Sequence, residues 1–110
     1  MVRLGPQCPT DVKEKASQAT WDFSFISDDN RVKIAAAGAI LPLLALLGPQ
    51  NTVEVQKNAA GTLWNLALNV ENQAIIRSAW GVAALNQLIQ TTTNAAVRST
   101  ANGALDAVNA

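Results

Sequence analysis

The side chains that most often carry out catalysis are rare in this chain and are not grouped along it. The 110 residues contain no histidine, so the commonest general base and the commonest transition-metal ligand are both missing. The eight acidic residues are scattered, and no glycine-rich phosphate loop follows a strand pattern. We therefore expect no enzymatic activity, no metal site and no cofactor.

Cys8 is the only cysteine, so the chain cannot form an internal disulfide. A reducing compartment is the simpler interpretation, and no apolar run that would mark a signal peptide follows Arg3. The expected location is therefore cytoplasmic or nuclear. A reactive role for the Cys8 thiol is the lesser alternative, since no cationic cluster is predicted around it.

Charge gives no reason to expect a nucleic acid or an anionic membrane as partner, because the formal net charge is zero. Charged residues make up 15% of the chain, and beyond residue 57 only Glu71, Arg77, Arg98 and Asp106 remain. So sparse a pattern suggests that part of the C-terminal half is normally covered. The uncharged run 34–48 is shorter than the ~20 residues of a membrane span and is interrupted by Gly38 and Pro42, so it is interpreted as a buried helix corner.

The elements that would have to position a binding site are helices. The clearest helix lies within the stretch from Pro49 to Leu68, where apolar residues recur with the helical period of 3.6: Val55, Ala59, Leu63 and Leu66. Asn51 and Glu54 have the spacing of a capping pair for its first turn.

The same pattern occurs twice more along the chain. An offset of 43 residues places Val12, Ala16, Trp21 and Phe23 over Val55, Ala59, Trp64 and Leu66. An offset of 42 residues places Val97, Ala101, Gly103, Leu105 and Val108 over Val55, Ala59, Gly61, Leu63 and Leu66. Because no single unit can bury its apolar stripe alone, the units are predicted to stack and share one core.

Each unit is predicted to contain a short, a medium and a long helix. An irregular lead-in (1–9) and the long helix of a partial unit (10–27) precede two full units, 30–69 and 72–110. In the first full unit the predicted helices are 31–37, about 40–48 and the long helix already described, with a corner at Gly38. In the second they are 72–79, 82–90 and 95–108, with a turn at Trp80–Gly81 and Thr93 or Asn94 as the last cap.

Three-helix units of this period point to an all-α fold, a right-handed α-solenoid. The sequence resembles the armadillo repeat family in NRVKIAAAGAILPLLALL (30–47) followed by VEVQKNAAGTLWNLA (53–67). The resemblance implies a protein–protein interaction scaffold whose long third helices line a concave groove. In that family a recurring asparagine hydrogen-bonds an extended peptide, since its amide offers both a donor and an acceptor.

The resemblance assigns the groove asparagine to Asn65, with Asp22 and Ala107 as its counterparts in the other long helices. The same groove row adds these positions: Lys15, Gln18, Trp21, Asn58, Gly61, Trp64, Thr100 and Gly103. Importin-α-type proteins carry a tryptophan at the position of Gly61, so nuclear-signal binding of that type is not expected.

Several of these residues also have a purely structural interpretation. Asn65 could instead hydrogen-bond the end of a neighbouring helix, and Trp21 and Trp64 could pack between repeats. Trp80 is expected to pack at its corner, with a role as ligand platform as the alternative. Asp22 with Lys15 is either a solvated helix face or a selector of a charged partner side chain.

A second functional hypothesis is self-assembly. The first unit lacks its two leading helices and no polar capping helix is predicted at either end, so uncapped apolar ends could stack into a homo-oligomer. The chain could also be a fragment of a longer armadillo protein.

Overall fold

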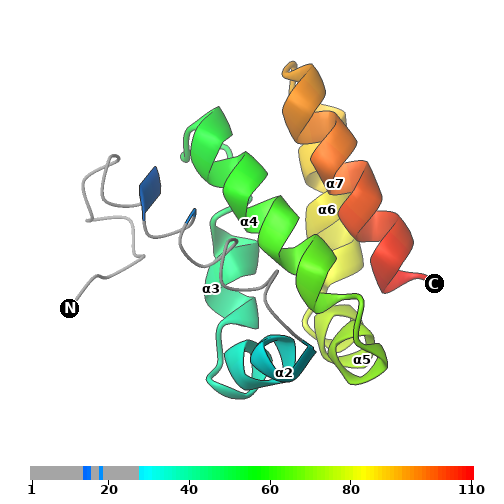
Figure 1. The fold of residues 1–110 in the computed structure, drawn as a ribbon. Helices are drawn as coiled ribbons and strands as arrows, with labels where there is room; N and C mark the ends of the chain where they lie inside the picture. The colour runs from blue at the N-terminus through cyan, green and yellow to red at the C-terminus, as the bar shows by residue number, and fades with distance from the viewer. Residues whose placement is uncertain (1–13, 16–17, 19–27) are drawn as a thin grey trace.

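The computed structural model describes residues 14, 15, 18 and 28–110, and within these residues every regular element is a helix (Figure 1). The helices are α2 (Asp28–Ala36), α3 (Ile40–Ala45), α4 (Val53–Leu66), α5 (Val70–Ser78), α6 (Gly81–Thr91) and α7 (Ala95–Val108). Residues 14, 15 and 18 are also helical. The lead-in and the rest of the predicted helix 10–27 lie outside the described residues.

The helices form two units of the same design, α2–α3–α4 and α5–α6–α7. The long helices α4 and α7 lie side by side, α3 and α6 lie behind them, and α2 and α5 lie at one end (Figure 1). The predicted order of short, medium and long helix is confirmed in the second unit. In the first unit α3, with six residues, is shorter than α2, with nine, so the predicted order of the first two helices is wrong there. As in other solenoids, each unit completes its core only by packing against its neighbour.

The shared core lies between the two units and follows the predicted apolar stripe. All four stripe residues of α4 are fully buried: Val55, Ala59, Leu63 and Leu66. In α7 the equivalent residues Val97, Ala101 and Val108 are buried as well. Burying a Val or Leu side chain contributes about 1.5–3 kcal/mol, so this stripe is a main source of stability.

The start of α4 differs from the prediction. Thr52 is its N-cap, and the Thr52 hydroxyl accepts a hydrogen bond of 3.2 Å from the backbone N–H of Val55. Asn51 instead turns back and donates to the carbonyl of Ala45 at 3.4 Å. The predicted Asn51 cap is therefore wrong by one residue, because threonine and asparagine are both good caps and the spacing cannot choose between neighbours.

Asparagine side chains cap two of the other helices. Asn94 caps α7, and its side-chain oxygen accepts from the N–H of Val97 at 3.0 Å. Asn69 caps α5 in the same way through Asn72, so α5 begins two residues before the predicted start.

Two corners join the short helices to the medium ones. Gly38 has a φ of 83°, as its role in a sharp corner predicts. In the second unit the left-handed position is taken by Trp80, with φ 66° and ψ 27°. Gly81 follows because a Cβ there would lie 2.7 Å from the carbonyl oxygen of Ile76. The displaced glycine thus permits a close approach of α6 to α5.

Long polar side chains tie successive helices together. The amide of Gln56 donates to the carbonyl of Gly48 at 3.0 Å, and the amide of Gln73 donates to Ala67 at 2.9 Å. These bonds satisfy carbonyls at the ends of α3 and α4 that have no partner within their own helix. Asn72 links the two units, because its amide donates to the carbonyl of Arg31 in α2 at 3.2 Å.

Part of the outer face of the second unit is polar. Positions that face the second unit from α2, α3 and α4 are apolar, whereas their counterparts 42 residues later are exposed and polar: Ala35 and Arg77, Leu44 and Asn86, Ala60 and Asn102, Trp64 and Asp106. Arg77 also donates to the carbonyl of Val108 at 2.6 Å, at the end of α7. A polar outer face is typical of a capping repeat. These four positions argue against the expected apolar C-terminal face. The expectation stays a prediction, because Val82, Ile89 and Leu105 in the same unit are only half-buried.

Among the described residues, no helix combines the length and the apolar character that crossing a bilayer requires.

Candidate functional site

The predicted groove row lies along the two long helices, and Trp64 and Gly103 determine how closely these helices approach. A Cβ on Gly103 would lie 2.6 Å from Cη2 and Cζ3 of Trp64, so the six-membered part of the indole lies directly on the backbone of α7. A side chain at position 103 would force either the indole of Trp64 to move or the two helices to separate. The tryptophan and the glycine therefore form one close contact between α4 and α7, beside the buried apolar stripe.

Trp64 is also partly accessible at the surface. The side chain remains 41% exposed although it packs against α7. The packing interpretation is therefore confirmed, because the ring lies between the units, whereas a groove contact through the accessible part of the side chain stays a prediction. An aromatic ring with one covered and one accessible face is a suitable anchor for a partner side chain.

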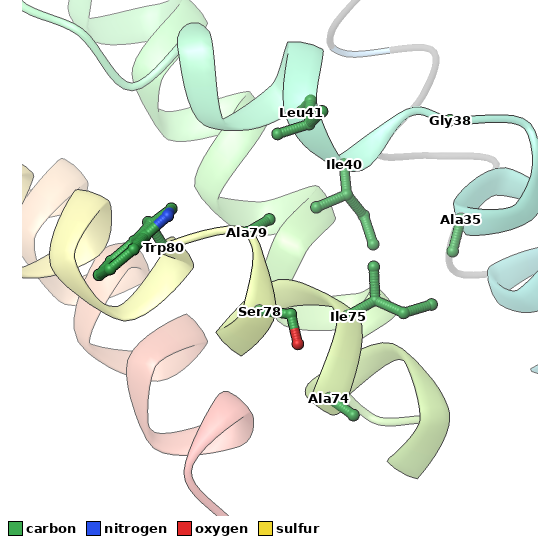
Figure 2. Close-up of a pocket in the computed structure, with 9 residues that line it drawn as sticks. All are labelled: Ala35, Gly38, Ile40, Leu41, Ala74, Ile75, Ser78, Ala79 and Trp80. Atoms are coloured by element: carbon green, nitrogen blue, oxygen red, sulfur yellow. The ribbon is translucent and has the colours of Figure 1, made fainter.

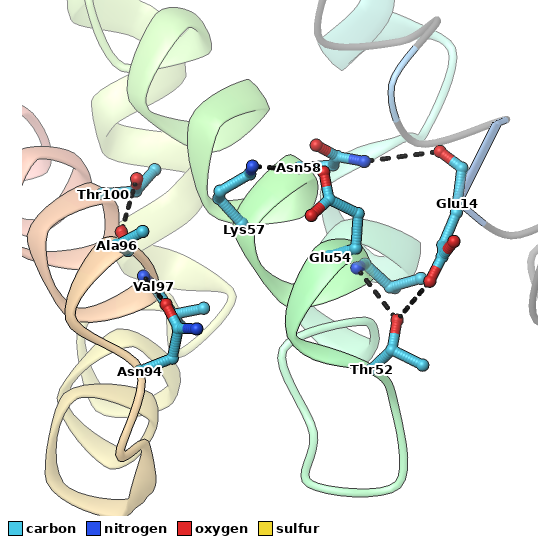
Figure 3. A network of polar contacts seen from close by, with 10 residues as sticks. Glu14, Thr52, Glu54, Lys57, Asn58, Asn94, Ala96, Val97 and Thr100 are labelled. Atoms are coloured by element: carbon cyan, nitrogen blue, oxygen red, sulfur yellow. Dashed lines mark hydrogen bonds and ion pairs between the residues drawn. The ribbon is translucent and has the colours of Figure 1, made fainter.

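The amide side chains of the row are less accessible than their assignment suggests. Asn65 is 6% exposed, and Asn58 is 1% exposed with its amide donating to the backbone carbonyl of Glu14 at 3.3 Å (Figure 3). Gly61 is buried as well. In the structure, Asn58 thus links α4 to the helical residue Glu14, which lies far earlier in the chain.

The remaining positions of the row are divided between accessible and undescribed residues. Lys15 and Gln18 are exposed, and Gly103, Thr100 and Ala107 on α7 are half-buried. Trp21 and Asp22 lie outside the described residues. On α4 and α7, the accessible part of the row therefore runs from Trp64 to the half-buried positions of α7.

Polar contacts gather where α4 begins, at one end of this row (Figure 3). The Thr52 hydroxyl donates to a carboxylate oxygen of Glu14 at 2.9 Å, in addition to its capping role. Glu54 and Lys57 form an ion pair of 3.1 Å one turn apart. An ion pair with this exposure contributes less than about 1 kcal/mol, so it adds little to stability.

The described residues contain no grouping of side chains suited to metal binding. No three histidine, cysteine, aspartate or glutamate side chains within this part of the chain lie where they could hold a metal ion. What the long helices offer is an aromatic face, amides and small residues, which is the chemistry of binding.

A second surface was not assigned to function from the sequence. Trp80 is 80% exposed, so the expectation that it packs at its corner is wrong. With Leu41 and Ile75 it stands around a hollow of about 650 Å³ between the two short helices (Figure 2). One signal was visible in the sequence, since a tryptophan stands where the first unit has the corner glycine Gly38.

Comparisons with known proteins identify the fold. The profile of the armadillo/beta-catenin-like repeat matches residues 27–68. No curated protein sequence matches the chain. An engineered protein from the Northeast Structural Genomics Consortium superimposes with a TM-score of 0.88 at 30% identity, over 98% of this chain and 43% of that one.

Other designed proteins match in the same way. The designed armadillo repeat protein YIII(Dq)4CqI gives a TM-score of 0.85 at 30% identity, over 98% of this chain and 45% of that one. A further engineered protein gives 0.87 at 29% identity, over 97% of this chain and 26% of that one. The chain thus spans less than half the length of each of these structures. Residues 27–68 match an armadillo repeat, and the part of the chain that the structure describes is an all-α, right-handed α-solenoid of armadillo-type three-helix repeats.

Proposed function

We propose that the chain is a scaffold that binds an extended peptide or partner segment along α4 and α7. Armadillo repeats are commonly protein-binding scaffolds. In this chain we place the binding site on Trp64 of α4 and on the half-buried positions of the groove row on α7. The observation that carries the proposal is the position of the Trp64 ring, seated on Gly103 and still 41% exposed. A large apolar surface held rigidly between two helices favours partner contact over simple core packing.

The partner would lie across the line of contact between the long helices α4 and α7. Helices pack about 8–10 Å apart and an extended chain rises about 3.3 Å per residue, so neighbouring repeats meet a peptide every three residues or so. Asn65 follows Trp64 in α4 and carries the amide that the family uses on peptide backbones. We assign the side-chain contact to Trp64, with Ala107 as part of the floor on α7. Asn65 is only 6% exposed, so we assign it a backbone contact through the small part of the residue that stays accessible.

The test is selection from a library of displayed dodecapeptides against the immobilised chain, followed by affinity measurement on variants. Ala107→Arg places a long charged side chain on the half-buried floor of the row and should weaken groove binding by on the order of tenfold, about 1.4 kcal/mol. Gln90→Arg, on the exposed end of α6, is the matched control and should bind normally. Selected peptides that bind both variants equally well would contradict the proposal.

The alternative hypothesis, self-assembly through stacked ends, is not favoured on the C-terminal side. Stacking there would bury the charged side chains of Arg77 and Asp106, and burying a charge without a partner is strongly unfavourable. The N-terminal side of the first unit borders undescribed residues, so we base no proposal on it.

A further inference from the structure

We propose that the hollow between α2 and α5 is a second binding site, which takes a short, uncharged, apolar peptide segment. This hollow is separate from the groove, because none of its lining residues belongs to α4 or α7. Its lining comes from α2, α3, α5 and the two corners, as Figure 2 shows.

The lining explains why a space exists there. The two facing short helices carry small side chains at this level, namely Ala35 on α2 and Ala74 and Ser78 on α5. These side chains are too short to fill the gap between the helices. The result is an open hollow of about 650 Å³, within the range of about 300–1,000 Å³ that is usual for ligand pockets.

The rim of the hollow consists of exposed apolar side chains. Trp80, Leu41 and Ile75 are 80%, 67% and 45% exposed, and all three border the hollow. Scattered exposed apolar residues are ordinary, but three large ones around a single concavity mark an interaction site. In Figure 2, Leu41 and Trp80 lie on one side of the hollow and Ile75 extends from the other.

Trp80 adopts a backbone conformation that is energetically unfavourable for any residue with a Cβ atom. Its φ of 66° is left-handed, and this conformation costs an ordinary L-residue about 1–2 kcal/mol relative to glycine. The equivalent corner in the first unit is Gly38, with a φ of 83°, so glycine satisfies the same turn. At 80% exposure the indole recovers little of this cost by packing. The fold alone therefore gives no reason for tryptophan at position 80, whereas a ligand contact does.

The size and charge of the hollow define its occupant. At these exposures the three rim side chains present about 400 Å² together, if each offers about 200 Å² when fully exposed. A stable dimer needs about 800 Å² from each partner, so a second copy of this chain is a poor fit. Every lining side chain is uncharged and only Ser78 is polar, which favours aliphatic or aromatic side chains with little charge.

The test is selection of displayed heptapeptides on the full chain, with binding measured by titration of the ¹⁵N-labelled protein. Ala74→Leu fills the hollow from the exposed side of α5, and Trp80→Gly removes the rim ring while suiting the backbone. Ala96→Leu, at an exposed position in the first turn of α7, is the matched control for added apolar volume. The selected peptides should be apolar and should shift the indole N–H resonance of Trp80.

The expected result is a loss of affinity of at least tenfold in Ala74→Leu and in Trp80→Gly, and unchanged affinity in Ala96→Leu. Trp80→Gly should also unfold at the same or a higher urea concentration than the parent chain. A clear drop in its unfolding midpoint would overturn the proposal, because the indole would then be a structural element. Three further results would also overturn it: peptides that bind both pocket variants normally, peptides that lose affinity only in Ala107→Arg, or a dimer that Trp80→Gly dissolves.

Discussion

At Gly103, helix propensity and the packing between the two units favour different residues. Within an isolated helix, alanine is more favourable than glycine by about 1 kcal/mol. In this molecule the indole of Trp64 occupies the space that a Cβ at position 103 would need. The glycine is therefore explained by its neighbour in the other unit and not by its own helix.

Replacing Gly103 by alanine should lower the free energy of unfolding by about 1–2 kcal/mol, because the cost of overpacking exceeds the gain in helix propensity. Urea denaturation followed by circular dichroism measures the change. In a Trp64→Leu background the same substitution should be neutral or stabilising, since the ring is gone. A stabilised single variant would show that the ring does not lie on the backbone of α7.

At this scale the sequence predicted positions better than contacts. The repeat placed Trp64 and Gly103 correctly on the long helices, because apolar periodicity determines which face of a helix is buried. It could not predict that one lies on the other, since that contact depends on the spacing between two helices. The exposure of Trp80 was mispredicted for a related reason. Aromatic residues are usually buried, and the sequence does not show that the facing short helices leave a gap.

At the scale of the element, the helix starts depend on small polar side chains. Thr52, Asn69 and Asn94 cap the three helices α4, α5 and α7 through the same side-chain bond to the third residue on. Periodicity predicted all six described helices, with the ends displaced by up to three residues. Such displacement is expected, because several adjacent residues can each cap a helix and only the path of the incoming chain selects one.

Thr52→Ala should destabilise the chain by about 1 kcal/mol, because it removes the cap of α4. Thr52 also donates to Glu14 at 2.9 Å, so the loss should not be smaller than that of an ordinary cap. Asn51→Ala should change the unfolding free energy by only a few tenths of a kcal/mol, since its hydrogen bond to Ala45 is long at 3.4 Å. Thermal unfolding of the two variants side by side measures the difference, and a larger effect at Asn51 would restore the cap predicted from the sequence.

At the scale of the whole molecule, the two units differ on one equivalent face. In the first unit this face packs against the second unit, and in the second unit it is exposed to solvent. The first unit meets the second with Leu44, Ala60 and Trp64, whereas the second unit carries Asn86, Asn102 and Asp106 at those positions. The internal repeat conserves the core stripe and changes the outward face. The fold was predictable from the stripe, while the polar outer face becomes evident only once the structure identifies which residues of the first unit face the second.

Restoring the first unit's residues on the outer face should make the chain associate. The triple variant Asn86→Leu, Asn102→Ala and Asp106→Trp would present an apolar stacking surface in place of a polar one. Size-exclusion chromatography with light scattering should then give a larger mass for the variant than for the parent chain at the same concentration. Lys33→Trp adds one indole to the exposed side of α2 and should leave the mass unchanged. An unchanged mass for the triple variant would mean that these positions do not control stacking.

The seating of Trp64 on Gly103 also has a spectroscopic consequence. Detachment of α7 would expose the indole to water, so its emission would shift to longer wavelength while α4 itself is still folded. The indole of Trp80 is already largely in water and would respond little to the same event. Fraying of the second unit should therefore shift the fluorescence before most of the helical circular dichroism is lost, whereas melting of the whole solenoid should change both signals together.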